Sequence, residues 1–479
     1  MHCNSIRFGA TFLASAAFVS QAAAAGTPTT SISRDVVIIG GGASGAHAAV
    51  WLRDQNKTVA VVEKKGVLGG HTAVYNDPDT GKPINVGVQG WIEYENTMDF
   101  VERMGVSTNG SMQFTTLTSE FIDFKTGLPV DGYSAPADAE KYAALQTILD
   151  IWEPYENLTM PGFFNFPNAS STPDDLLLPF GEFVDKYNVS AGVPAIWEAT
   201  AMGLSNTMDV PTLYVVQASG VPMVRALLGL GASVVPPSGS LHELYDAIAT
   251  FLGDDVLYSS TVIDSTRNDP GVTVHVANAN GTVTEINAKR LLIAIEPTED
   301  NLAPFSLDDT ETAVFDKFGY ATVYAGILKH PSLALSTSYS NTLPAAAPEN
   351  WTVYPVASQL GRIDYLGGTT DLFQFTAVGT ENDTSESIQA LIGDVIDTMI
   401  AAGTLPQTNG TLSFPAFANH GMMHSRVSAD DLRAGFIQQL YALQGRRSTY
   451  YTGAAFSAGF STVLWAFNEE LLPRLIEGI

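Results

Sequence analysis

Residues 35–65 read DVVIIGGGASGAHAAVWLRDQNKTVAVVEKK, and this stretch decides the fold. An apolar run, a glycine cluster, a helix-like segment, a polar turn and a second apolar run follow one another, as in a β-strand, α-helix, β-strand unit. Gly40, Gly42 and Gly45 have the spacing G-x-G-x-x-G. The first glycine of this motif permits a tight turn, the second admits a pyrophosphate, and the third lets helix and strand pack closely. The stretch predicts a Rossmann-like dinucleotide-binding domain.

The residues after the glycine cluster fit the same prediction. Ala43 and Ser44 open the predicted helix, whose free N–H groups and positive dipole end favour phosphates. Glu63 ends the second predicted strand, where a carboxylate can accept hydrogen bonds from the hydroxyls of an adenosine ribose. A carboxylate at this place repels a 2′-phosphate, which disfavours NADP.

The next residues, KKGVLGGHTAVY at 64–75, resemble the extended FAD-binding signature of the flavin amine oxidase superfamily. In that signature a Gly-Gly pair over the pyrophosphate follows the ribose glutamate, and Gly69 and Gly70 match it. Amine oxidases usually continue with Arg, whereas this chain has His71 and Thr72. Together with DPDTGKPINVGVQGW at 77–91, the histidine form resembles a fungal secreted branch that includes beta-cyclopiazonate dehydrogenase. It is also similar to bacterial FAD-containing polyunsaturated fatty acid isomerases. The resemblance implies FAD as the cofactor, with Lys64 among its contacts.

Two later segments carry the same resemblance. Residues 256–296 contain three predicted strands, and the resemblance implies that the backbone near Val262 meets the adenine. Residues 443–475 contain a predicted strand at 449–452, then Gly453, then a predicted helix from Ser461 and Thr462. The resemblance implies that this helix N-terminus points at the flavin pyrimidine ring, where it stabilises the negative charge that develops on reduction.

The predicted fold class is α/β, with a Rossmann-like FAD-binding domain of the amine oxidase and glutathione reductase type and a discontinuous α+β substrate domain. The FAD-binding domain is expected at 34–100, 236–300 and 415–479, and the substrate domain at 101–235 and 301–414. The substrate domain is rich in aromatic residues, which form either its core or an apolar cavity in front of the flavin. They are Tyr155, Phe163, Phe164, Phe166, Trp197, Tyr214, Tyr320, Tyr324, Trp351 and Tyr354.

Few residues are candidates for catalysis, because hydride or electron transfer to a flavin needs little beyond position, dryness and one base. Gln89 is expected either to hydrogen-bond the flavin ring or the substrate, or to be a surface amide. His420 resembles a histidine that the fungal branch places before its final FAD motif, near the active site. His420 and His424 could form an acid/base pair on a helix, but Gly421 and Pro415 predict a loop. No carboxylate motif accompanies them, so a metal site is not expected.

His71 has three open interpretations: a noncovalent cofactor contact, a covalent link to the flavin, or a structural role. Amine oxidases also place a lysine that holds water against flavin N5. The corresponding predicted strand, YATVYAGILK at 320–329, has a lysine only at its end, Lys329.

Composition excludes several classes of protein. The 479 residues predict two or three domain-sized lobes. A content of 45% hydrophobic and 15% charged residues excludes a disordered or coiled-coil protein. The formal charge of −27 repels phosphate backbones and anionic lipids, so nucleic-acid and membrane partners are not expected.

The first residues predict the compartment. Residues 1–25 contain Arg7, an apolar stretch and Ala22–Ala25, as in a cleaved secretory signal peptide. The single cysteine, Cys3, leaves with this segment, so no cysteinyl cofactor link is expected. The nine Asn-x-Ser/Thr sequons fit a eukaryotic secretory route and N-glycosylation. They begin at Asn56, Asn109, Asn157, Asn168, Asn188, Asn280, Asn350, Asn382 and Asn409.

The sequence therefore predicts a secreted FAD-dependent oxidoreductase of a small, largely apolar substrate, such as a secondary metabolite. Oxygen or another acceptor would reoxidise the reduced flavin. Two alternatives stay open: an FAD-dependent double-bond isomerase of a fatty acid, and a flavin-binding protein without turnover.

Overall fold

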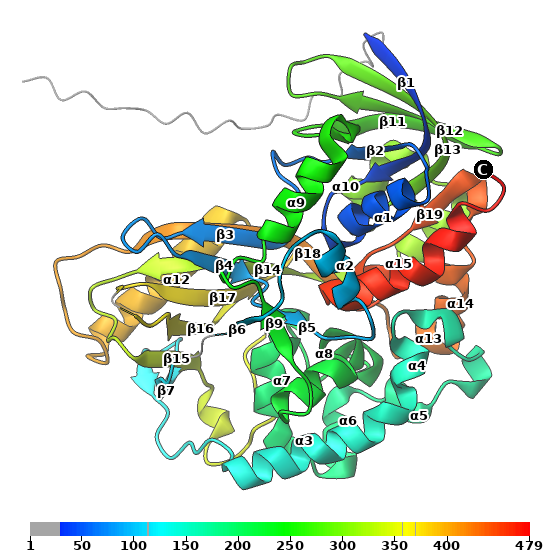
Figure 1. Ribbon diagram of the computed structural model, residues 1–479. Coiled ribbons are helices and arrows are strands. Elements are labelled where there is room, and N and C mark those ends of the chain that lie inside the picture. Colours follow the sequence, from blue (N-terminus) through cyan, green and yellow to red (C-terminus); the bar gives the residue numbers. More distant parts are fainter. Residues whose placement is uncertain (1–28, 113–114, 357, 369) are drawn as a thin grey trace, which may run out of the picture.

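The computed structural model describes residues 29–112, 115–356, 358–368 and 370–479. The predicted signal peptide and Cys3 lie outside the described residues. Two large sheets and a group of helices make up the molecule, with the first sheet at the top of the view, the second on the left and the helices below (Figure 1). None of the helices in the described ranges is long and apolar enough to cross a membrane.

The first sheet is the predicted Rossmann-like sheet. Its spatial order is β10 (Val256–Leu257), β2 (Val59–Val62), β1 (Thr30–Ile39), β13 (Val283–Ile293), β12 (Gly271–Ala277) and β11 (Thr261–Asn268), and β19 (Thr449–Tyr451) also pairs with β13. β1 runs parallel to both β2 and β13, while β11, β12 and β13 form an antiparallel meander. The apolar run of β1 is buried on both faces, as expected for a central parallel strand. The predicted strand, helix and strand are confirmed, with α1 at Ala43–Asp54.

The second sheet has the order β18 (Ser413–Arg426), β14 (Gly319–Lys329), β17 (Phe373–Gly379), β16 (Gln359–Tyr365), β15 (Thr337–Asn341), β7 (Thr118–Asp123) and β8 (Leu128–Pro129). Helix α12 (Ser385–Ala401) packs on it, and Ile388, Ile392 and Phe375 belong to their shared core. Two small sheets adjoin the large ones. They are β3 (Thr72–Asn76) with β4 (Pro83–Gly87), and β5 (Trp91–Ile92) with β9 (Ser233–Val235) and β6 (Gly110–Ser111).

The loop predicted around His420 is wrong, because residues 413–426 form strand β18. Gly421 has a φ of 76° and lies beside a shift in the register with β14, so a bulge accommodates it within the strand. β18 is an edge strand, where the missing N–H of Pro415 costs no ladder hydrogen bond on the open side. The domain boundary expected at residue 415 therefore falls inside a strand of the second sheet.

Helices fill the space below and between the sheets. Their bounds are α2 (Met98–Arg103), α3 (Asp138–Trp152), α4 (Glu156–Thr159), α5 (Asp174–Leu177), α6 (Phe180–Tyr187), α7 (Val193–Ala199), α8 (Thr212–Leu227), α9 (Glu243–Leu252), α10 (Glu299–Leu302), α11 (Asp309–Phe315), α13 (Ala429–Arg433), α14 (Phe436–Tyr441) and α15 (Ser461–Leu475). Short 3₁₀ turns include η5 (Ala201–Leu204) and η10 (Ala454–Phe456). Gly220 has a φ of 64° inside α8, so α8 is two helices joined at a kink.

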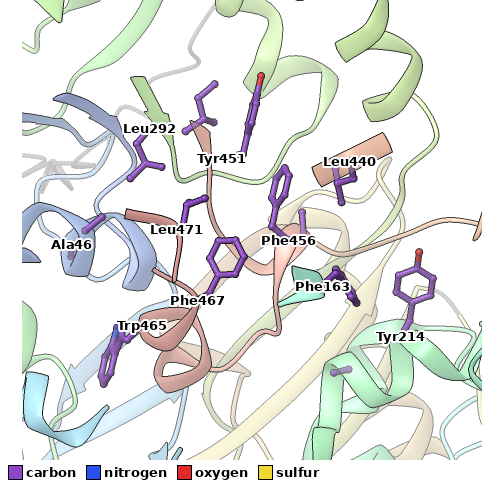
Figure 2. Close-up of a cluster of buried hydrophobic side chains, with 14 of the residues drawn as sticks. Ala46, Phe163, Tyr214, Leu292, Leu440, Tyr451, Phe456, Trp465, Phe467 and Leu471 are labelled. Atoms are coloured by element: carbon purple, nitrogen blue, oxygen red, sulfur yellow. The ribbon is translucent and has the colours of Figure 1, made fainter. Parts of the chain in front are cut away.

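One hydrophobic core joins the first sheet to the helices. Figure 2 shows Leu292 of β13, Tyr451 of β19 and Phe467 of α15 converging with Phe163 from the helical region. Phe164 stacks on Phe467 with 5.0 Å between ring centroids. This continuous packing fixes the substrate-side helices relative to the nucleotide-binding sheet.

Candidate flavin and substrate site

The three fingerprint glycines are required for different reasons. Gly40 has a φ of 99°, in the left-handed region that favours glycine. A Cβ on Gly45 would overlap the carbonyl oxygen of Gly40, so close packing of α1 on β1 excludes a side chain there. A Cβ on Gly42 would meet only the Cα of Gly70, at 3.6 Å, which is an ordinary contact. No atom of the described residues therefore requires glycine at position 42, and the space in front of it suits a ligand.

Two helices that pack against each other, α1 and α15, begin without side-chain caps. Gly42 is the N-cap of α1 and Phe460 that of α15, and neither helix has a capping hydrogen bond from its N-cap side chain. Asn468 of α15 donates to the backbone oxygen of Ser44 at 2.8 Å and accepts from the Thr452 hydroxyl at 2.7 Å. The two N-termini are thus held in fixed relation, and both offer unpaired N–H groups to an anionic or electron-rich ligand.

Glu63 lies buried at the carboxyl end of β2. One carboxylate oxygen accepts from the N–H of Gly41 and the other from the N–H of Lys65, both at 2.7 Å. The N–H of Ser260 donates to the backbone oxygen of Glu63, so the segment that leads to Val262 runs beside β2. The structure thus brings together the residues predicted for the ribose and the adenine.

The Gly-Gly turn closes over the fingerprint. Gly69 and Gly70 have φ values of 114° and 56°, and a Cβ on Gly70 would lie 2.9 Å from the Cα of Gly42. The Lys65 ammonium donates to the carbonyl oxygen of Gly70 at 2.8 Å. Burial lowers the pKa of Lys65, and the nearby Glu63 carboxylate opposes this. Lys65 thus brings to this turn a positive charge that His71 does not carry.

His71 and His420 lie against each other beside this turn. Their ring centroids are 5.1 Å apart, with the ring planes at 69°. Part of the His71 side chain is exposed to solvent. The protein atoms packed around its ring disfavour the charged form and lower its pKa to about 4, and the positive charge of Lys65 acts in the same direction. Burial, with His71 and Lys65 acting in the same direction, lowers the pKa of His420 to about 3. Both imidazoles are therefore neutral at neutral pH, and each can hydrogen-bond without carrying charge.

Gly87 makes room for His420. A Cβ on Gly87 would lie 2.6 Å from Nε2 of His420, and the φ of Gly87 is 94°. Nε2 of His420 is buried and has no hydrogen-bond partner among the described residues. A buried polar atom without a partner is costly, and here it borders Gly87, two residues before the predicted site residue Gln89.

Gln89 and Lys329 lie apart from this pair. Gln89 is exposed, and its Nε2 donates to the backbone oxygen of Asn85 at 3.1 Å, so its contact with flavin or substrate stays a prediction. Lys329 pairs with Asp371 at 2.7 Å. In the β14–β18 register Lys329 faces Ser413, whereas Tyr324 faces Asn419, next to His420. Five residues of strand separate the two places by about 17 Å, so Lys329 does not serve this site.

Most of the predicted aromatic set belongs to the protein core. Trp197 stacks on Tyr354 with centroids 4.5 Å apart, and Phe163 packs edge to face on Tyr441. Tyr324 is buried and donates to the backbone oxygen of Asp383. The aromatic residues as a set therefore do not outline a substrate cavity.

Two residues near the site have a buried polar atom without a partner, and neither was named as a site residue. The Glu296 side chain has one such oxygen, and burial raises its pKa to about 7. The resemblance implies that its stretch, AIEP at 294–297, passes the cofactor, and its neighbour Ile295 lies close to Gly40. The Tyr245 hydroxyl is buried without a partner, close to Thr72 and Ser461. Tyr245 lies on an ordinary amphipathic helix, α9, and nothing in the sequence distinguishes it.

The described residues fit FAD on several independent observations. The space beside Gly42 has no packing reason to be left open, the uncapped helices α1 and α15 pack against each other, and Lys65 brings a cation. The Thr462 hydroxyl, in the first turn of α15, is buried without a partner.

Known proteins carry the same combination of fold and cofactor. Residues 38–104 match the NAD(P)-binding Rossmann-like domain family. The chain is 33% identical to FAD-dependent oxidoreductase pigF of Monascus ruber, over 95% of this chain and 94% of that protein. It is 32% identical to beta-cyclopiazonate dehydrogenase of Aspergillus oryzae, over 93% of each chain.

Solved structures share the fold at lower identity. The fatty acid isomerase of P. acnes that produces CLA superposes with a TM-score of 0.69 at 18% identity, over 92% of this chain and 99% of that one. Cyclohexylamine oxidase of Brevibacterium oxydans superposes with a TM-score of 0.60 at 17% identity, over 92% and 98% of the two chains. The fold is therefore that of the flavin amine oxidases, and the cofactor is FAD. The chain is an enzyme that belongs to the family of fungal FAD-dependent oxidoreductases that includes beta-cyclopiazonate dehydrogenase.

Proposed function

We propose that this protein is a secreted oxidoreductase that oxidises a small, largely apolar secondary metabolite and passes the electrons to oxygen or another acceptor. The observation that carries the proposal is the pair of neutral histidines, His71 and His420. They lie beside the FAD cradle, by which we mean the fingerprint glycines, Glu63 and the Gly69–Gly70 turn. A relative over nearly the whole chain is named for dehydrogenation of a fungal metabolite, beta-cyclopiazonate, and this name supports the substrate class.

FAD supplies the redox chemistry when bound, because it accepts a hydride or electrons from the substrate. Gly42 and the N-terminus of α1 would hold the phosphates of FAD, and the N-terminus of α15 would stabilise negative charge on the flavin. Nε2 of His420 can accept a hydrogen bond from a substrate O–H or N–H and so orient the bond that is oxidised. A pKa of about 3 makes His420 a weak base, so its role is orientation rather than proton storage.

Secretion and N-glycosylation belong to the same proposal. All nine sequon asparagines are exposed, whereas half of the other asparagines in the described ranges are not. In two sequons the threonine hydroxyl already donates to the asparagine oxygen, from Thr282 to Asn280 and from Thr352 to Asn350. These features support a chain whose sequons are accessible to the glycosylation machinery.

Anaerobic titration with fractionated fungal metabolite extracts tests the proposal. We expect one fraction to bleach the flavin, and readmitted oxygen or an added acceptor to restore the colour with stoichiometric peroxide or reduced acceptor. A shifted double bond without any acceptor would instead establish an isomerase. Failure of every fraction to bleach the flavin would favour a flavin-binding protein without turnover.

A further inference from the structure

Arg426 is a cation without a counter-ion beside the candidate site. It ends strand β18, and its side chain is half-buried. Its Nη1 donates to the backbone oxygen of His424 at 3.0 Å. Burial lowers its pKa, the Tyr214 hydroxyl opposes this, and no carboxylate contributes. Among the described residues, Arg426 forms no ion pair.

Two other arginines of this chain are compensated by carboxylates. Arg267 is fully buried and contacts Glu311 at 2.7 Å. Arg362 pairs with Asp364 at 2.6 Å and with Glu198 at 3.1 Å. Because arginine does not lose its proton and buried charges in proteins are normally paired, the half-buried guanidinium of Arg426 favours a partner that the described residues do not supply.

The position of Arg426 relates it to the histidines. β18 packs against β3, β4, η5, α8 and η10, and so forms a wall between the cofactor segments and the helices. His424 precedes Arg426 by two residues, and its ring lies against Gly203 of η5. Burial lowers the pKa of His424 to about 4, with Arg426 and then His71 acting in the same direction. Arg426 thus follows His420 and His424 along one strand, and His420 contacts His71 beside the Gly-Gly turn.

We infer that Arg426 binds a carboxylate, or an equivalent planar oxyanion, of the substrate. A guanidinium offers parallel N–H groups that match such an anion in two hydrogen bonds. In a chain of formal charge −27, a cation left without a carboxylate favours an acidic ligand. The inference rests on the proposed function and narrows its substrate class to apolar molecules with one acidic group.

A purely structural role makes a different prediction. His424 has a φ of 53°, in the left-handed region, and the hydrogen bond from Arg426 to its carbonyl oxygen could serve only to hold this bulge. In that case loss of the guanidinium would weaken acidic and neutral ligands equally. The two roles therefore separate in a comparison of matched anionic and neutral probes.

The experiment titrates the oxidised, FAD-loaded protein with trans-cinnamate and octanoate, and with cinnamamide and octanamide as neutral counterparts. The readout is the perturbation of the flavin absorption spectrum, which needs no turnover. The variants are Arg426→Met and Arg426→Lys, with Arg433→Met as the control because Arg433 is exposed and pairs with Asp430 on α13. FAD content and thermal unfolding identify any variant that has lost its fold.

We expect the wild type and Arg433→Met to bind at least one carboxylate more tightly than its amide. Arg426→Met should weaken the carboxylate roughly 10- to 100-fold and leave the amide unchanged, and Arg426→Lys should retain part of the preference. Equal weakening of both probes, a preference for the amide, or no response to either carboxylate would overturn the inference. Because none of these measurements involves substrate oxidation, they are independent of the anaerobic bleaching test.

Discussion

Gly42 and Gly45 belong to one motif, yet the two positions need glycine for different reasons. A Cβ on Gly45 overlaps the backbone of Gly40, whereas one on Gly42 makes only an ordinary contact with the Cα of Gly70. Gly42→Val should therefore give a colourless protein that still folds, and Gly45→Ala should lower stability itself. FAD content after purification and thermal unfolding of the apoprotein distinguish the two. A fully loaded yellow Gly42→Val variant would contradict the placement of the pyrophosphate.

Lys65 is expected to replace the charge that amine oxidases carry on the arginine after the Gly-Gly pair. Its ammonium reaches the carbonyl of Gly70, whereas the sequence predicted its exposed neighbour Lys64, and not Lys65, as the cofactor contact. Lys65→Gln should weaken FAD binding by about 1.5–3 kcal/mol, the range for a hydrogen bond to a charged group. Titration of apoprotein with FAD at two salt concentrations measures this, because loss of a phosphate contact also reduces salt dependence. Lys82→Gln, at the exposed tip of the β3–β4 hairpin, is the charge-matched control.

His71 is the residue at which we test whether the flavin is bound covalently or noncovalently. The ring lies against His420, and a contact of this kind does not by itself direct a ring nitrogen at a flavin methyl group. We expect acid precipitation to release free FAD, and His71→Ala to change the flavin spectrum or FAD retention. A flavinylated peptide containing His71 in mass spectrometry would overturn the first expectation. A normal spectrum and normal affinity in His71→Ala would remove His71 from the site.

At the scale of elements, the sequence predicted local units well and long-range pairing poorly. The segments around Gly40 and Ser461 were identified because strand, glycine turn and helix follow each other directly in the chain. β18 was missed because its evidence is not local: Gly421 and Pro415 normally break a strand, and only pairing with β14 accommodates them. The neighbours His71 and His420 are almost 350 residues apart, and no spacing rule joins them. Arg426 likewise became noticeable only when its surroundings were known.

The histidines of β18 give this strand a defined pH response. The pKa values of His420 and His424 fall from 6.5 to about 3 and about 4 on folding, so the unfolded chain binds more protons between these limits. The free energy of unfolding of the apoprotein should therefore fall as pH is lowered below about 6.5. Urea unfolding at pH 7.5, 6.5 and 5.5 measures the slope. His424→Asn should flatten it, since asparagine tolerates the positive φ and does not titrate. An unchanged slope would show that His424 is solvated.

At the scale of the whole molecule, we expect solubility to come from the composition of the surface. A formal charge of −27 provides part of it, through carboxylates that outnumber lysine and arginine by more than two to one. The exposed sequons would provide the rest, and they are spread over the first sheet, the second sheet and the helices rather than gathered on one face.

This distribution leads to the last prediction. Secreted from a eukaryotic host, the protein should begin near Gly26 and lose mass on treatment with peptide-N-glycosidase, with sugar on several sequon peptides. Asn280 is a suitable single test, because it lies in the exposed turn between β12 and β13, far along the chain from the cradle residues. Asn280→Gln should remove one glycan mass and leave FAD content unchanged, whereas Thr282→Ala should remove the same glycan while keeping the asparagine. A secreted protein with every sequon unmodified would contradict the glycosylation proposal, and retention of residues 1–25 would contradict the signal peptide. Neither result would alter the assignment of FAD, which depends on the fold and the relatives alone.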